Sequence, residues 1–137
     1  MKKKLFSLLS ILFLPVLGYS NCSGTPSTWT NGSTDQKWST ITNWNPSTCF
    51  PDGTTDSATF IDQANSISLD ATITLGKINF TTTIGNITWD FSPNAPGDHF
   101  IFTGSASQIN VTPTSSFFGI TIDGDFVVPI VITNTNT

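Results

Sequence analysis

Residues 72–80 read Thr-Ile-Thr-Leu-Gly-Lys-Ile-Asn-Phe, and apolar side chains alternate with polar ones on both sides of the central glycine. A period of two is typical of a β-strand with one buried face and one solvated face. Similar short stretches follow each other from residue 57 onward, separated by residues that favour turns. We expect strands at 58–61, 66–69, 72–80, 86–91, 100–103, 108–112, 117–122 and 126–132.

The composition supports an all-β protein without nucleic-acid chemistry. Thr, Ser and Asn supply most polar positions, charged residues make up only 10% of the chain, and no amphipathic helix follows Ser20. There is no Arg and no Glu, and after Ser20 only Lys37 and Lys77 stand against nine Asp, a net charge of 2 − 9 = −7. An acidic surface repels phosphate backbones, which argues against a nucleic-acid partner.

The beginning of the chain predicts a secretory signal peptide. Residues 1–4 read MKKK, an apolar run covers 5–17, and small residues precede a cleavage position after Ser20. The run is broken by Pro15 and is shorter than the roughly 20 residues that span a bilayer. We therefore expect a signal peptide at 1–20 and a secreted chain of 137 − 20 = 117 residues.

Two cysteines remain in this secreted chain, Cys22 and Cys49. In an oxidising compartment such a pair is most simply a disulfide. Lipidation of Cys22 is the competing interpretation, but the bulky polar Asn21 beside it is wrong for a lipidation signal. We expect Cys22 and Cys49 to pair, which would stabilise the fold by about 3–4 kcal/mol.

The organisation after the signal changes near residue 56. Residues 21–56 are rich in turn formers and carry three of the four Trp, whereas 57–137 hold the repeated strands. We expect a Trp-rich cap at 21–56 and a strand-repeat region at 57–137. Shifting the chain so that Ile67 falls on Ile109 also places Ile78 on Ile120, and apolar character is kept although almost no identities are.

Residues 29–80 contain several short motifs in a characteristic order. They are Trp29, Trp38, Asn43-Trp44, a proline at 51, and Asp56-Ser57-Ala58-Thr59-Phe60, which leads into the alternating strands. This order resembles the start of the passenger region in bacterial autotransporter-like surface proteins and related secreted β-solenoids. The resemblance implies a β-helix with an N-terminal cap, a role at the cell surface and association with the outer membrane. The two cysteines and the few strands depart from such passengers, which puts outer-membrane anchorage and self-transport in doubt.

A cap of this kind has a physical reason. The first turn of a β-helix would expose an open strand edge and an open apolar end. Large aromatic rings can cover that end, because each buries roughly 150–250 Å². We therefore interpret Trp29, Trp38, Trp44 and Phe60 as structural cap residues, with Asp56 turning the chain by bonding its own backbone.

The fold that these observations predict is a short right-handed β-solenoid (β-helix), with a β-sandwich as the alternative. The last predicted strand, 126–132, is strongly apolar and would present an edge that favours a partner. Two readings stay open for it: the chain is a truncated piece of a longer passenger and self-associates through this strand, or the strand pairs inside a closed sandwich.

Catalytic groups are few. His99 is the only histidine and no G-x-S-x-G motif accompanies it. Asp90 and the pair Asp123 and Asp125 are the carboxylates that a glycosidase would use, yet Asp before Gly is far more often conformational. Turns at 52–56 and 123–125 could offer oxygen ligands to calcium, but neither is an EF-hand loop. We predict no enzyme activity, no cofactor and no metal.

The function predicted from the sequence is that of a secreted or cell-surface adhesin or passenger-like scaffold. Its partner would be an unknown surface molecule or a glycan. The alternative function is a carbohydrate-binding β-sandwich that stacks sugars on exposed Trp faces, Trp44 and Trp89 being the candidates.

Overall fold

The computed structural model describes residues 22–63, 65–83, 87–103, 107–113, 118–122 and 131–134, and the predicted β class is confirmed. A single short 3-10 helix, η1 (Ile41–Asn43), accompanies the strands in these residues. The strands are β1 (Pro26–Trp29), β2 (Trp44–Asn45), β3 (Gly53–Ile61), β4 (Asn65–Leu69), β5 (Ile73–Thr82), β6 (Ile87–Pro93), β7 (Phe100–Phe102), β8 (Gln108–Pro113), β9 (Phe118–Ile122) and β10 (Val131–Asn134).

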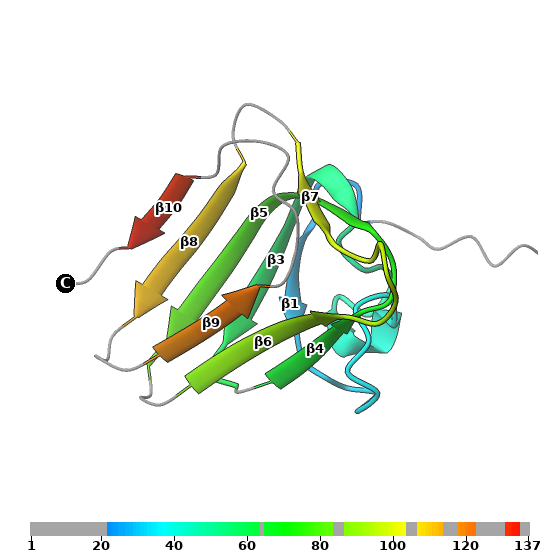
Figure 1. The fold of residues 1–137 in the computed structure, drawn as a ribbon, viewed down its shortest axis with the longest axis horizontal. Helices are drawn as coiled ribbons and strands as arrows, with labels where there is room; N and C mark the ends of the chain where they lie inside the picture. The colour runs from blue at the N-terminus through cyan, green and yellow to red at the C-terminus, as the bar shows by residue number, and fades with distance from the viewer. Residues whose placement is uncertain are drawn as a thin grey trace, which may run out of the picture.

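The strands form two sheets that lie over each other (Figure 1). The large sheet has the order β10-β8-β5-β3-β1-β2, and β7 pairs with the first part of β5. The small sheet has the order β4-β6-β9. All pairings are parallel except the one between β1 and β2, so neighbours within a sheet come from segments far apart in sequence.

From β3 onward the chain alternates between the sheets, except that β7 and β8 follow each other in the large sheet, and residues of neighbouring strands pair in register. In the large sheet Ala58 pairs with Ile78, Ile78 with Ile109 and Ile109 with Ile132, and these steps along the sequence are unequal in length. The predicted constant shift is wrong, because it would align Ile67 of the small sheet with Ile109 of the large one.

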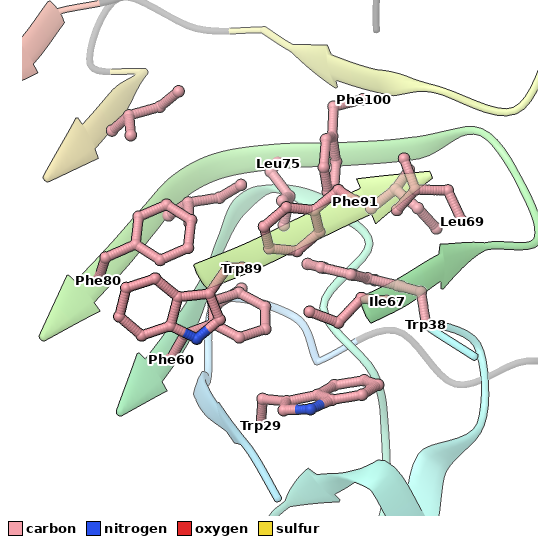
Figure 2. Close-up of a cluster of buried hydrophobic side chains, with 14 of the residues drawn as sticks. Trp29, Trp38, Phe60, Ile67, Leu69, Leu75, Phe80, Trp89, Phe91 and Phe100 are labelled. Atoms are coloured by element: carbon pink, nitrogen blue, oxygen red, sulfur yellow. The ribbon is translucent and has the colours of Figure 1, made fainter. Parts of the chain in front are cut away.

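The core lies between the two sheets. Figure 2 shows Phe80, Trp89 and Phe91 meeting there, with Trp38 and Trp29 reaching in from the N-terminal residues. The period-two pattern explains this arrangement. Every second residue is buried in the first part of β6 and on each side of Gly76-Lys77 in β5, where the alternation is interrupted once. The largest side chains in this core are Trp38, Trp44, Trp89, Phe60, Phe80, Phe91, Phe100 and Phe102.

The strand bounds depart from the predictions mainly before residue 58. β3 begins at Gly53 and therefore crosses the boundary that we expected between residues 56 and 57. β1 and β2 were not predicted as strands, because they are short and their pairing partners are remote in sequence. The strand predicted at 126–132 overlaps β10 only at 131–132, and 126–130 lie outside the described residues.

No helix in the described part of the chain is long and apolar enough to cross a membrane. The predicted signal peptide, residues 1–20, lies outside the residues that the structure describes.

Candidate functional site

The predicted disulfide is confirmed. Cys22 and Cys49 are bonded, their Cα atoms are 5.2 Å apart, and both residues are buried. The hydroxyl of Ser27, itself buried on β1, lies 3.0 Å from the Cys22 sulfur. The bond ties the start of the described chain to the residues just before β3. A buried disulfide is compatible with an extracellular location.

Three tryptophans of residues 22–50, here called the N-terminal segment, form a buried aromatic cluster with Phe60. The Trp44 ring lies edge-on to its two neighbours, with centroid distances of 5.0 Å to Trp29 and 4.6 Å to Trp38. The Trp38 centroid lies 6.0 Å from that of Phe60, and Trp38 donates its indole N–H to the Pro51 carbonyl at 2.8 Å. These rings fill the core beside the first strands of both sheets.

The prediction that Trp44 and Trp89 offer exposed faces to a sugar is wrong. Only 1% of Trp44 and 0% of Trp89 is exposed to solvent. Trp89 lies on β6 with its ring centroid 5.1 Å from that of Phe80, and Trp44 donates its indole N–H to the Trp38 carbonyl at 2.7 Å. A sugar ring cannot stack on an aromatic face that the protein core already covers.

Asp56 holds the N-terminal segment against β3. Its carboxylate is fully buried and accepts hydrogen bonds from the backbone N–H groups of Cys22 at 3.2 Å, Asp52 at 3.0 Å and Gly24. The expectation that Asp56 turns the chain by bonding its own neighbourhood is therefore only part of its role. Two of its three donors, Cys22 and Gly24, are remote from it in the sequence.

Asp35 is the centre of a second polar network, which the sequence analysis missed. Its carboxylate accepts from the hydroxyls of Ser33 at 2.6 Å and Thr40 at 2.7 Å, from the side-chain amide of Asn43 at 2.7 Å and from the backbone N–H of Lys37 at 3.1 Å. Burial by itself would raise the pKa of Asp35, but these four hydrogen bonds outweigh it and hold the pKa well below its usual range.

Asp52, in the turn that was considered for calcium, and Asp98 each accept a hydrogen bond from a backbone N–H group. Asp52 accepts from the backbone N–H of Thr74 at 2.7 Å, and Asp98 accepts from that of Ala95 at 2.8 Å. The His99 ring contacts the Gly97 carbonyl at 2.6 Å, in the same loop. Among the residues described, no group of three or more His, Cys, Asp or Glu could hold a metal ion. Asp123 and Asp125 lie outside that part of the chain.

The outer face of the large sheet carries polar residues in register. Thr28 pairs with Thr59, Thr59 with Asn79, and Asn79 with Asn110, so that one row runs across β1, β3, β5 and β8. Along it the Asn110 amide donates to the Asn79 side-chain oxygen at 2.8 Å, and the Asn79 amide donates to the Thr59 hydroxyl at 3.4 Å. A parallel row pairs Thr81 with Thr112. The result is a face of hydroxyls and amides, with the exposed side chain of Ile61 beside Thr81.

Comparisons with protein-family models, with curated proteins and with solved structures found no match to this chain. The resemblance to autotransporter-like passengers therefore stays a prediction.

Proposed function

We propose that the chain is the capped N-terminal end of a short right-handed β-solenoid, exported to the cell surface, where it serves as a non-enzymatic adhesin or scaffold. The observation that carries this proposal is that strands from β3 onward alternate between two sheets and pair in parallel, with β7 and β8 both lying beside β5 in the large sheet. It favours a solenoid over the alternative β-sandwich, because consecutive strands of a sandwich mostly pair with each other as antiparallel neighbours. Parallel crossovers are right-handed in nearly all proteins.

The cap role rests on what the N-terminal segment covers. β1 lies along the first edge of the large sheet, parallel to β3, and Lys37 forms a parallel bridge with Ser68 of β4 in the small sheet. Trp29, Trp38 and Trp44 bury their rings at the same end of the core. The N-terminal segment thus pairs with the edge strands of both sheets and covers the apolar end of the core. The first turn of a solenoid requires both.

The adhesive surface that we propose is the outer face of the large sheet, and its partner is a neutral surface glycan. Hydroxyls and amides both donate and accept hydrogen bonds, as sugar hydroxyls do. Lys77 is the one charged side chain among the outward residues of the described strands of this face, although the chain as a whole is acidic. A nearly uncharged face spread over several strands suits an extended polymer better than an enclosed small molecule.

A glycan-binding experiment with matched charge variants tests this function. We expect the secreted protein to bind at least one neutral oligosaccharide on a printed glycan array. The double variant Thr81→Asp/Thr112→Asp places two carboxylates on the outer face of the large sheet, where the side chains are half-buried or exposed. Binding should fall at least about tenfold, because a carboxylate that the glycan covers without pairing it loses its solvation.

The control is Ser66→Asp/Thr88→Asp, which adds the same charge at exposed positions of β4 and β6. It should bind like the unmodified protein. An equal loss in both double variants, or no glycan bound by the unmodified protein, would show that this face is not a glycan-binding surface.

We also propose that a second copy of the chain associates through the last strands. β9 and β10 stand at the ends of the small and the large sheet, and in the part of the chain that the structure describes each pairs with one neighbour only. A strand edge of this kind is a template for pairing.

A further inference from the structure

The edge strands at the two ends of the sheets differ in whether their outward backbone groups are bonded. At the N-terminal end these groups belong to residues 36–38. This short stretch lies along the edge of β4 that is not paired with β6. The backbone N–H of Trp38 donates to the Ser68 carbonyl at 2.9 Å, and the N–H of Ser68 donates to the Gln36 carbonyl at 2.8 Å. Among the described residues, residues 36–38 are thus the outermost chain beside the small sheet at this end. They join β4 through one parallel bridge between Lys37 and Ser68, and Gln36 itself has a positive φ of 60°.

In a parallel bridge the residues before and after the bridging residue bond the partner strand, and the N–H and C=O of the bridging residue point to the other side. Since Gln36 and Trp38 bond β4, the N–H and C=O of Lys37 point away from it, where a further strand would pair. Both groups are instead bonded by side chains of the same segment. The N–H donates to the Asp35 carboxylate at 3.1 Å. The C=O accepts from the Asn43 side-chain amide at 3.0 Å and from the backbone N–H of Thr40 at 3.4 Å.

Asp35 and Asn43 are themselves held in place as a pair. The Asn43 amide donates to Asp35 at 2.7 Å, and the Asn43 side-chain oxygen accepts from the backbone N–H of Ser33 at 2.9 Å. Asn43 is fully buried. The carboxylate stands where a carbonyl of a further strand would be, and the amide stands where an N–H would be. The pair therefore bonds the outward N–H and C=O of Lys37 as a further strand would, but it presents no unpaired backbone groups of its own to another chain.

The neighbouring groups at this end are also occupied. The Trp38 carbonyl accepts from the indole N–H of Trp44 at 2.7 Å. In the large sheet β1 is covered by β2, which is antiparallel to it and pairs at only two positions. Short edge strands and bonded edge groups are the usual means of preventing strand addition.

We propose that the protein self-associates at one end only: a second copy docks against β9 and β10, and the Asp35–Asn43 pair prevents pairing at the opposite end, so that assembly stops at two copies. This inference rests on the proposed solenoid and its association through the last strands. An edge that meets its own copy across a twofold axis makes a closed contact, whereas two adhesive ends would build a filament.

The test is the molar mass of the protein, measured by light scattering over a concentration series. We expect the unmodified protein to level off at twice the monomer mass. Asp35→Ala/Asn43→Ala removes the side-chain partners of the Lys37 N–H and C=O, leaving the C=O only the backbone N–H of Thr40 at 3.4 Å. This variant should grow beyond two copies. The matched control, Asn94→Ala/Asp98→Ala, removes an Asn and an Asp from another loop and should level off at two copies.

Adding Lys37→Pro to the Asp35→Ala/Asn43→Ala variant removes the outward N–H, because proline has none. Growth should then return to two copies. Far-ultraviolet circular dichroism checks that each variant is folded. If loss of the buried Asn43 prevents folding, the single variant Asp35→Ala, altered at an exposed residue, gives the same comparison.

The outcomes separate this inference from the proposal on which it rests. If the molar mass of Asp35→Ala/Asn43→Ala levels off at the same value as that of the unmodified protein, the proposed role of the Asp35–Asn43 pair is wrong. Unlimited growth of the unmodified protein overturns it as well, while leaving self-association intact. A monomeric unmodified protein beside a variant that forms two copies supports the pair but contradicts association through β9 and β10.

Discussion

Asp35 is the residue whose charge matters most to the N-terminal segment. Its ionised carboxylate receives four hydrogen bonds, which hold its pKa below the ordinary value of about 3.9 although burial acts in the opposite direction. A carboxyl group with a lowered pKa in the folded state stabilises the fold above its unfolded pKa. That contribution is lost as the pH falls below about 4 toward the folded-state pKa.

Asp35→Asn should therefore lower the melting temperature most at pH values above about 4. The difference from the unmodified protein should narrow as the pH is lowered toward 2, because protonation then removes the advantage of the carboxylate. Thermal unfolding of both proteins between pH 2 and 7 measures this. A difference that stays constant over the range would contradict the assigned role of the charge.

Asp56 stabilises the fold because its buried carboxylate accepts backbone hydrogen bonds, and not because it lies in a surface turn. Asp56→Ala leaves the N–H groups of Cys22, Gly24 and Asp52 without their acceptor. We expect the free energy of unfolding to fall by about 3 kcal/mol or more, since each buried unsatisfied donor costs about 1–3 kcal/mol. Urea denaturation measures the loss.

The matched control for Asp56 is Asp98→Ala, which removes a carboxylate bonded to one backbone N–H in an exposed loop. Its cost should stay under about 1 kcal/mol. Equal losses in the two variants would mean that burial of Asp56 is not what makes it important.

Residues of this kind mark the limit of prediction from sequence. The disulfide could be predicted because only two cysteines follow the expected cleavage position. The partners of Asp56 could not, since Cys22 and Gly24 are 34 and 32 positions away and no local pattern joins them. The hydrogen-bond network around Asp35 could not be predicted either, because its side-chain partners are serine, threonine and asparagine, which are common throughout this chain.

At the scale of single elements, β3 and β5 meet with an irregularity that depends on a glycine. Their register shifts between Gly53 and Ser57, where β3 bulges, and the chain of Thr54 approaches Gly76 of β5. A Cβ on residue 76 would lie 2.5 Å from the Thr54 carbonyl oxygen, well inside contact distance. Only a residue without a side chain lets the two backbones approach so closely.

Gly76→Ala should destabilise the protein by about 1–3 kcal/mol, because backbone atoms of β3 must shift to admit the methyl group. Chemical denaturation compares it with Thr74→Ala, a change at a half-buried position of the same strand that keeps the backbone hydrogen bond to Asp52. A Gly76→Ala variant as stable as Thr74→Ala would contradict the close approach.

Element prediction succeeded where one strand carries its own pattern. β4 to β8 alternate inward and outward residues over several positions, and the expected stretches at 66–69, 72–80, 86–91, 100–103 and 108–112 overlap them. β1 and β2 hold only a few residues each and exist because other segments pair with them. The repeat was misjudged because the step from Ala58 to Ile78 is much shorter than the step from Ile78 to Ile109, and no constant shift can reproduce both.

At the scale of the whole molecule, one covalent bond fastens the N-terminal segment at both of its ends. Replacing both cysteines, Cys22→Ser/Cys49→Ser, removes a link across 27 positions. The loss of loop closure should lower the free energy of unfolding by about 3.5 kcal/mol. Urea denaturation of the variant and of the unmodified protein measures it, and a loss below about 1 kcal/mol would show that Asp56 and the tryptophans hold the segment without the bond.

The tightly packed indoles also have an optical consequence. Trp38 and Trp44 have ring centroids 4.6 Å apart and planes inclined by 66°, close enough for their electronic transitions to couple. The far-ultraviolet circular dichroism of the protein should therefore contain an aromatic exciton band on top of the backbone signal, and strand content fitted without that band would be in error. Trp29, whose centroid lies 5.0 Å from that of Trp44, belongs to the same segment. Disappearance of the band during unfolding would therefore time the release of the N-terminal segment separately from the melting of the sheets.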